Sequence, residues 1–340
     1  MVPKVTALPA GLAESFLDRP FVVNGPEAFN ALAMDLFRMH AEHNAVYREY
    51  IAALGVGSGK VQSVAEIPCL PITLFRSQRV LLDGLDPRFT FTSSGTTGAI
   101  TSQHHVPWPE VYERSFFTSF KATYGDPTEW RILALLPSYL ERSGSSLVYM
   151  AEKLIAASSD PLSGTYLNKL ADLADVLRRS EAEGRKTLLL GVPFALLDLA
   201  EQHPMPLRHT TIMETGGMKG RRPEMVREEL HRILCAAFGV KSIHSEYGMT
   251  ELLSQAWSRG EGRYRCPPWM QVRLRDVNDP FASVPDERTG GINVIDLANI
   301  GSCPFISTQD LGRRHADGSI EVLGRFDNSD LRGCNLMVGI

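Results

Sequence analysis

The sequence predicts an α/β protein, with a sheet covered by helices and a second, smaller lobe rich in β-strands. Between about residues 109 and 245, short apolar strands alternate with amphipathic helices, which is typical of a sheet with helices on both faces. After Gln255 the helices give way to short strands divided by glycine and proline turns. We therefore expect residues 1–255 to form the α/β core and residues 256–340 the β-rich lobe.

The N-terminal part of the core is expected to begin with helices. Residues 26–54 place apolar side chains at helical spacing after Pro26, which predicts one or two amphipathic helices. The stretch VQSVAEIPCLPITLF (61–75) mixes β-branched residues with prolines and is typical of an irregular wall or an edge strand. RFTFT (88–92) predicts a short strand that runs directly into the loop SSGTTG (93–98).

The alternating segment and the lobe each supply several further elements. Apolar runs predict strands at 130–137, 186–191, 210–215 and 241–245. Apolar residues at helical spacing predict helices at 109–124, about 145–157, about 167–183, 194–202 and 223–239. In the lobe, strands are expected at 270–277, 290–296 and 319–325.

Composition excludes several classes of protein. The 340-residue chain carries a net charge of -4, and no nucleic-acid partner is expected because such proteins normally show a basic excess. Prolines and acidic residues interrupt the N-terminus, unlike a signal peptide, and no apolar run is long enough to span a bilayer, so we expect a cytoplasmic protein. Five cysteines without CxxC pairing or a histidine cluster indicate free thiols rather than a zinc site or disulfides.

Three segments rich in glycine and polar side chains follow predicted strands, where open α/β sheets bind their ligands. They are SSGTTG (93–98), ETGGMKG (214–220) and SEYGMTE (245–251). Hydroxyls and close backbone N–H groups suit SSGTTG to a phosphate, although a flexible linker has the same composition. Taken singly, ETGGMKG favours a tight turn and EYGMTE the start of a helix.

The order of these motifs along the chain is more specific than any one of them. SSGTTG, the GG turn, YGMTE, STQDLGRR (307–314) and GRFDNSD (324–330) together resemble the core motifs of the adenylate-forming enzymes, the superfamily of acyl-CoA synthetases and adenylation domains. The resemblance implies the fold of their N-terminal domain, ATP and Mg²⁺ as cofactors, and a carboxylic acid as substrate.

The resemblance also implies a role for each motif residue. The phosphate-binding residues would be Ser94, Gly95, Thr96, Thr97 and Gly98. Thr250 would hydrogen-bond the α-phosphate, and Glu251 would bind Mg²⁺, a hard cation that prefers oxygen ligands beside phosphates. The adenosine would be contacted by Gly216, Gly217, Tyr247 and Asp310, with Arg325 near Asp310. Without the resemblance, Asp310 is typical of a solvated turn and Arg325 of a surface cation.

The sequence departs from the superfamily pattern in two places. The phosphate loop usually carries a lysine shortly after its last glycine, but here residues 99–102 are AITS. Either the hydroxyls act without that cation, or another cation such as Lys219 substitutes for it. The chain also ends a few residues beyond GRFDNSD, so we expect the usual small C-terminal lid domain to be missing.

Four further segments point to one branch of the superfamily. LPSYLERSGSSLVYM (136–150), METGGMKG (213–220), SEYGMTELLSQAW (245–257) and LRGCNLM (331–337) resemble the acyl-protein synthetase family, the fatty-acid-activating component of bacterial bioluminescence reductase systems. This resemblance implies an acid–thiol ligase that forms a fatty acyl-AMP, transfers the acyl group to Cys334 as a thioester, and passes it to a partner acyl reductase.

Other interpretations remain open. Cys334 would otherwise be a small apolar residue that packs a final strand. The acyl group could instead pass to coenzyme A, as in relatives of phenylacetate-CoA ligase, or the chain could be a non-catalytic nucleotide-binding subunit of a reductase complex. His104 and His105 could each contact a ligand, but side chains of successive strand residues point to opposite faces, so they cannot both face one site. His244, just before SEYGMTE, has a similar claim.

Overall fold

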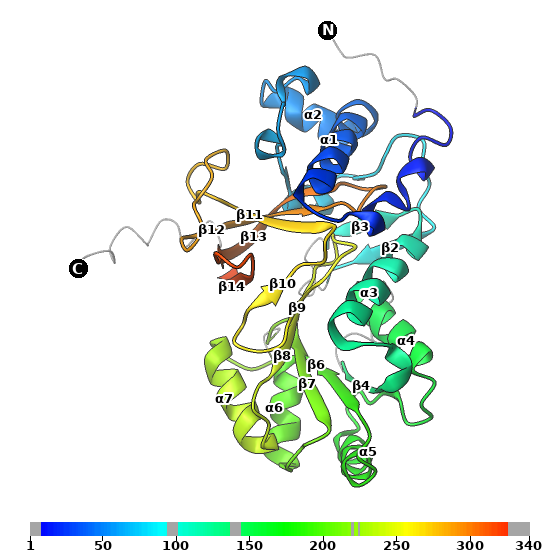
Figure 1. Cartoon of the computed structure of the whole chain (residues 1–340), viewed down its shortest axis with the longest axis vertical. Helices are drawn as coiled ribbons and strands as arrows, with labels where there is room; N and C mark the ends of the chain where they lie inside the picture. Colours follow the sequence, from blue (N-terminus) through cyan, green and yellow to red (C-terminus); the bar gives the residue numbers. More distant parts are fainter. Residues whose placement is uncertain (1–7, 94–100, 137–143, 219–220, 224, 326–340) are drawn as a thin grey trace, which may run out of the picture. The chain divides into compact units, whose positions relative to one another are not determined.

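The computed structural model describes residues 8–93, 101–136, 144–218, 221–223 and 225–325 and has the expected α/β architecture (Figure 1). The described residues form two compact units, both discontinuous in sequence. The described residues of unit 1 are 8–89, 101–108 and 266–325, and those of unit 2 are 90–93, 109–136, 144–218, 221–223 and 225–265. The boundary at residue 255 stays a prediction about domains. No helix in the described ranges is long and apolar enough to cross a membrane.

Unit 2 is built on a largely parallel sheet with the strand order β10-β9-β8-β7-β6-β4-β5. The strands are β4 (Arg131–Leu135), β5 (Gly164–Thr165), β6 (Thr187–Gly191), β7 (Thr210–Thr215), β8 (His244–Tyr247), β9 (Ala256–Ser258) and β10 (Tyr264–Arg265). Strands β4 to β8 pair in parallel, whereas β9 pairs antiparallel with both β8 and β10. Parallel strands β7 and β8 therefore end at the same edge of the sheet.

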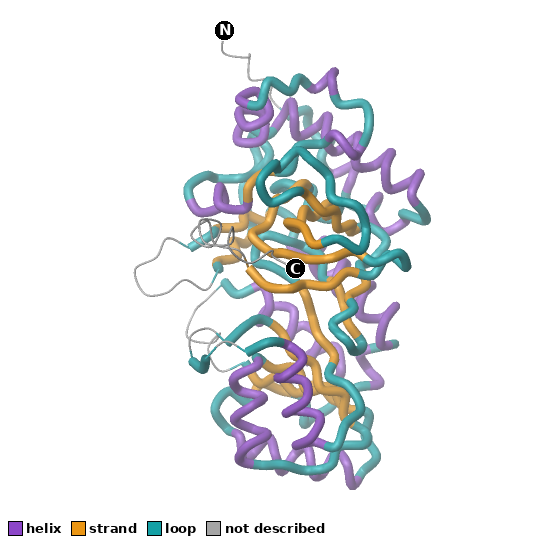
Figure 2. Tube along the Cα trace, turned by 90° about the vertical axis from the view of Figure 1, so that its left-hand side faces the viewer, coloured by secondary structure: helices purple, strands orange, loops and turns teal. Residues whose placement is uncertain are grey.

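Helices cover both faces of this sheet, as the sequence predicts (Figures 1 and 2). They are α3 (Pro109–Tyr124), α4 (Ser146–Ser158), α5 (Leu170–Ala182), α6 (Pro193–Gln202) and α7 (Arg227–Phe238). On one face, Tyr124 of α3 contacts His244 of β8, with 3.2 Å between the hydroxyl oxygen and Nδ1. On the other face, Arg227 of α7 lies 3.6 Å from the carboxylate of Glu214 in β7. Consecutive side chains of the central strands thus meet different helical layers.

The predicted positions of these elements hold closely, except that helix α7 begins at Arg227 rather than at residue 223 and that strand β8 is shifted. Helix α3 spans the predicted residues 109–124, and β7 spans the predicted residues 210–215. Strand β8 covers 244–247 rather than 241–245, so the predicted bounds of this strand are wrong. The shift arises because β8 pairs with β7 only from His244 onward, opposite Met213. Tyr247 is therefore the last residue of a central strand.

Unit 1 contains an antiparallel sheet in the order β11-β12-β13-β14, with β1 parallel to β13. Its strands are β1 (Leu70–Pro71), β3 (Gln103–Val106), β11 (Met270–Arg275), β12 (Thr289–Asp296), β13 (Phe305–Arg314) and β14 (Ile320–Arg325), and its helices are α1 (Pro26–His43) and α2 (Ala45–Ala53). Strand β2 (Phe89–Thr92) carries the chain from unit 1 to unit 2. The two N-terminal helices and the strands expected near 270, 290 and 320 are confirmed.

Buried polar contacts tie the N-terminal helices of unit 1 to its C-terminal residues. The Nε2–H of His40 donates to the carbonyl of Ile300 over 3.0 Å, and the Asn44 amide donates to the carbonyl of Ser302 over 2.7 Å. Burial lowers the pKa of His40 to about 3, so the ring is neutral and its Nδ1 can accept from Asn44. These hydrogen bonds join segments about 260 residues apart in the sequence.

Candidate active site

The carboxyl ends of β7 and β8 bring five of the predicted site residues to one edge of the unit 2 sheet. Thr215 and Glu246 are register partners, so Gly216 and Tyr247 follow side by side. Gly216 has a φ of 77°, a left-handed conformation that favours glycine, and it turns the chain into Gly217 at the end of β7. The turn after β8 carries Thr250 and Glu251, whose side chain is largely buried. We therefore find the two predicted motifs next to each other.

Glu246 is a buried carboxyl at the centre of this edge. The Thr215 hydroxyl donates to its Oε2 over 2.5 Å, which ties the ends of β7 and β8 together. Its other oxygen, Oε1, lies close to Gly248, where a Cβ atom would collide with it. Burial raises the pKa of Glu246 to about 7, the Thr215 hydrogen bond opposes this rise, and the nearby charge of Glu214 adds to it.

A separate set of buried polar groups links Gln255, just before β9, to helices α3 and α4. Gln255 donates through Nε2 to the hydroxyl of Tyr112 over 3.2 Å, and that hydroxyl donates to the carbonyl of Ser146 over 3.1 Å. The Oε1 of Gln255 is buried and accepts no hydrogen bond from the described residues. Phe91 contacts the ring of Tyr112 edge to face, with centroids 5.4 Å apart. The α3 side of the edge is thus mainly aromatic, with a few buried polar atoms.

Unit 1 brings together the other two described site residues. Asp310 of β13 and Arg325 of β14 are register partners, and Arg325 Nε lies 3.4 Å from Asp310 Oδ1. The side chain of Asp310 is 7% exposed whereas that of Arg325 is 70% exposed. Asp310 therefore lies in a strand rather than in a solvated turn, and Arg325 is the nearby cation that the family resemblance implies.

Several predicted residues lie outside the described part of the chain. They are Ser94, Gly95, Thr96, Thr97, Gly98, Lys219 and Cys334. The strand expected to lead into the phosphate loop is confirmed as β2, and the Thr92 backbone N–H donates to the carbonyl of Gly144 over 2.8 Å. The four described cysteines, which are Cys69, Cys235, Cys266 and Cys303, are free thiols.

The three histidines with a possible ligand role have different surroundings. His104 is buried, and its Nε2 lies 2.9 Å from the Asn299 side-chain oxygen, so it serves the core of unit 1. His105 is half-buried, which agrees with the expectation that the two rings point to opposite faces. His244 is half-buried against Tyr124, and burial lowers its pKa to about 4.

The donor set around Glu251 is compatible with a magnesium ion. Mg²⁺ is commonly held by one or two carboxylates together with substrate phosphates and water, rather than by a cage of protein ligands. Glu251 supplies one such carboxylate beside the hydroxyl of Thr250. Among the described residues there is no cluster of three or more His, Cys, Asp and Glu side chains that could hold a metal by itself.

Several solved ligase structures share the fold of this chain. ATP-bound MatB from Rhodopseudomonas palustris matches with a TM-score of 0.53 at 18% identity, over 69% of this chain and 47% of MatB. The open conformation of 2-hydroxyisobutyryl-CoA ligase in complex with 2-HIB-AMP and CoA matches with a TM-score of 0.66 at 14% identity, over 89% of this chain and 70% of that ligase. The same ligase in the thioesterification state matches with a TM-score of 0.63 at 15% identity, over 96% of this chain and 71% of the ligase.

These likenesses establish the fold, because the sequence identities are too low to carry an activity. The 2-hydroxyisobutyryl-CoA ligase has also been solved in a postadenylation state with 2-HIB-AMP. The matches of 0.62 to 0.66 in TM-score to this ligase confirm the expected α/β fold. The chain spans about half the length of the MatB chain, at 47%. No protein-family model and no curated protein matches this sequence.

Sequence reasoning missed Glu246, Gln255 and Tyr112. Glu246 stands directly before the YGMTE motif, so its position was visible, but a strand glutamate normally indicates a solvated face. Only the pairing of β8 between β7 and β9 shows that this glutamate is buried. Gln255 and Tyr112 carry no motif signal, because a hydrogen bond between residues 143 positions apart leaves no local pattern.

Proposed function

We propose that the protein activates a carboxylic acid with ATP to form an acyl-AMP, and then transfers the acyl group to a thiol. The observation that carries the proposal is the meeting of Gly216, Gly217, Tyr247, Thr250 and Glu251 at one sheet edge, in a fold shared with ligases crystallised with ATP or an acyl-AMP. Ligands of such sheets bind beyond the carboxyl ends of the strands.

In the first step, a carboxylate oxygen attacks the α-phosphorus of ATP, the bond from that phosphorus to the bridging oxygen breaks, and pyrophosphate leaves. Two anions must be brought together, so the site has to neutralise charge and fix geometry. In the proposal, Thr250 would donate to the α-phosphate, and Glu251 would hold Mg²⁺, which would supply positive charge to offset that of the phosphates. Thr96, Thr97 and Gly98 bind the leaving group, and Asp310 accepts hydrogen bonds from the ribose hydroxyls.

In the second step, a thiolate sulfur attacks the acyl carbon, the bond from that carbon to the phosphate oxygen breaks, and AMP leaves. We assign the thiol to Cys334 and the acid to the fatty acids, as the acyl-protein synthetase resemblance implies. The described cysteines are poor candidates, because burial raises the pKa of Cys69 to about 11 and that of Cys266 to about 12. An acyl reductase would then take the acyl group from Cys334.

A second candidate function is transfer of the acyl group to coenzyme A. The specific support is the likeness to 2-hydroxyisobutyryl-CoA ligase, which was crystallised with CoA in its thioesterification state. The match to that structure covers 96% of the present chain. This candidate shares the adenylation step, so the two functions differ only in the final acceptor.

Pyrophosphate exchange tests adenylation directly. The purified protein is incubated with ATP, Mg²⁺ and a panel of short, aromatic and long-chain acids, and incorporation of labelled pyrophosphate into ATP is measured. We expect exchange with at least one acid, and we expect Thr97→Ala to lower it without a loss of folded protein. Absence of exchange with every acid would leave only the non-catalytic nucleotide-binding subunit.

Intact-mass analysis then identifies the acceptor. With an active acid, we expect an acyl adduct that hydroxylamine removes, and we expect Cys334→Ala to abolish it. Cys235→Ala is the matched control, because Cys235 is a half-buried free thiol on α7. An adduct that persists in Cys334→Ala would contradict the assignment of the nucleophile. Release of acyl-CoA without any protein adduct would favour the CoA ligase.

A further inference from the structure

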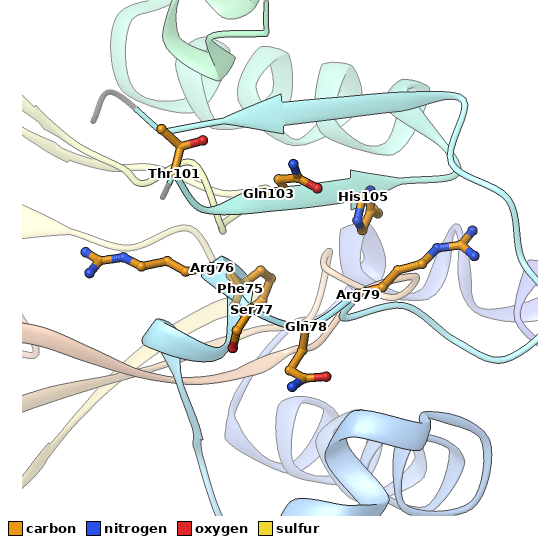
Figure 3. A pocket seen from close by; sticks show the side chains of 8 residues that line it. All are labelled: Phe75, Arg76, Ser77, Gln78, Arg79, Thr101, Gln103 and His105. Atoms are coloured by element: carbon orange, nitrogen blue, oxygen red, sulfur yellow. The ribbon is translucent and has the colours of Figure 1, made fainter. Parts of the chain in front are cut away.

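A polar groove runs across unit 1 between strand β3 and the segment that follows the 3-10 helix Ile72–Arg76. Its volume is about 380 Å³, which lies at the lower end of the range for small-molecule sites. One wall is formed by Arg76, Ser77, Gln78 and Arg79. The other wall is formed by every second residue from Thr101, just before β3, to His105 within it. Figure 3 shows the two arginines extending towards opposite ends of the groove.

The β3 wall consists of hydrogen-bonding groups because of strand alternation. Thr101, Gln103 and His105 line the groove, whereas the intervening Ser102 and His104 are buried. A hydroxyl, an amide and an imidazole therefore lie in a row (Figure 3). All three side chains can donate hydrogen bonds to an anion.

The groove is positively charged, and none of the described residues that line it is a carboxylate. Arg76 makes no ion pair with any residue that the structure describes. Arg79 lies 3.3 Å from Asp86, but the two side chains are 57% and 97% exposed. An exposed pair of this kind contributes little free energy, so Arg79 can turn to another anion at low cost.

The pKa of His105 responds to the positive charge of the groove. Burial and the nearby Arg79 lower the pKa of its ring. An anion bound between Arg79 and His105 would offset the charge of Arg79 and raise the pKa of His105, because an opposite charge favours the protonated imidazole. The ring is therefore a spectroscopic probe of the groove that does not depend on any enzymatic activity.

We propose that this groove binds a phosphate-bearing ligand with two separated anionic groups, one held by Arg76 at the Thr101 end and the other by Arg79 at the His105 end. Guanidinium groups suit phosphate oxygens because they donate two parallel hydrogen bonds. Within the proposed function, coenzyme A carries separated groups of this kind, which are its 3′-phosphate and its diphosphate. The two phosphates of released pyrophosphate share one oxygen, so pyrophosphate would occupy only one end of the groove. The site itself rests on the groove and not on the adenylation step.

Direct binding to the full chain tests the proposal. Pyrophosphate, coenzyme A and dephospho-coenzyme A are titrated by calorimetry, and the histidine side chains are followed by ¹⁵N-edited NMR, with His105→Gln to assign the His105 signal. We expect at least one ligand to bind and to shift the His105 resonances towards the protonated form. Tighter binding of coenzyme A than of its dephospho form would support a site with both ends occupied, and pyrophosphate that binds as tightly as coenzyme A would overturn it.

Substitutions locate the binding in the groove. Loss of one charge-assisted contact should weaken binding about tenfold in each of Arg76→Gln and Arg79→Gln. Arg38→Gln is the matched control, because Arg38 is an exposed arginine elsewhere in unit 1 whose loss should leave affinity unchanged. Affinity that survives both groove substitutions, unshifted His105 resonances, or no binding of any of the three ligands would overturn the proposal. Pyrophosphate exchange is measured separately, so failure of this site and failure of adenylation are distinguishable.

Discussion

Replacement of Glu246 by glutamine should stabilise the protein relative to wild type, and this advantage in unfolding free energy should grow as the pH rises. Burial raises the pKa of this carboxyl from its ordinary value of 4.5 to about 7. The unfolded chain then loses its proton near pH 4.5 while the folded chain keeps it to about pH 7. Between these values the folded state binds more protons, so the stability of wild type falls as the pH rises.

The size of the effect follows from the shift. One pKa unit corresponds to about 1.4 kcal/mol, so the ionised Glu246 costs the folded state about 3 kcal/mol above pH 7. Glutamine cannot ionise, and its side-chain oxygen can still accept from Thr215. The difference in unfolding free energy between Glu246→Gln and wild type should therefore grow by about 2–3 kcal/mol from about pH 5 to about pH 8.

Urea denaturation at several pH values measures this difference. Trp130 and Trp257 are buried in unit 2 and Trp269 is buried in unit 1, so tryptophan fluorescence follows the unfolding of both units. Glu152→Gln is the control, because Glu152 is an exposed residue of α4 and its profile should run parallel to wild type. A constant difference between Glu246→Gln and wild type across the whole range would refute the buried, proton-binding state of this carboxyl.

Three further perturbations have defined outcomes. Arg131→Met should lower the unfolding free energy by about 1–3 kcal/mol in urea titrations, because it removes a 2.9 Å ion pair from the buried Asp160 and leaves that carboxylate with Arg185; an unchanged midpoint would contradict this. Gly191→Ala should cost about 1–3 kcal/mol, seen as a lower Tm, since its Cβ would lie 2.8 Å from the Leu196 side chain; equal melting would show that the site relaxes freely. Glu251→Gln should lower pyrophosphate exchange about 100-fold and raise its Mg²⁺ requirement; an unaltered Mg²⁺ dependence would remove Glu251 from the metal site.

The elements that sequence predicts well are those whose own side chains determine them. Helix α3 carries aromatic residues at spacings of four, and its bounds agree with the prediction because its buried stripe is encoded locally. Strand β6 is a continuous apolar run and is likewise confirmed close to its predicted place. The motif turns after β7 and β8 were also found where the strand-to-loop pattern put them.

Features that depend on distant partners were not predictable in the same way. The bounds of β8 follow from its pairing with β7 and β9, which no local composition shows. The groove of unit 1 carries no sequence motif, because its positive charge comes from Arg76 and Arg79 on one side and its further hydrogen-bonding groups from the opposing residues in and before β3. Such clusters emerge only when separate segments fold against each other.

The alternation of side chains along β7 and β8 explains why two neighbouring glutamates differ. Glu214 points to the α7 face, where Arg227 and His231 lie within 3.7 Å of its carboxylate. Glu246 points to the α3 face, where the described residues supply a hydroxyl from Thr215 but no cation within ion-pair distance. A carboxyl that holds its proton near neutral pH can donate as well as accept a hydrogen bond. The edge beyond β8 thus contains, beside the proposed nucleotide contacts, a group whose hydrogen-bonding character changes with pH.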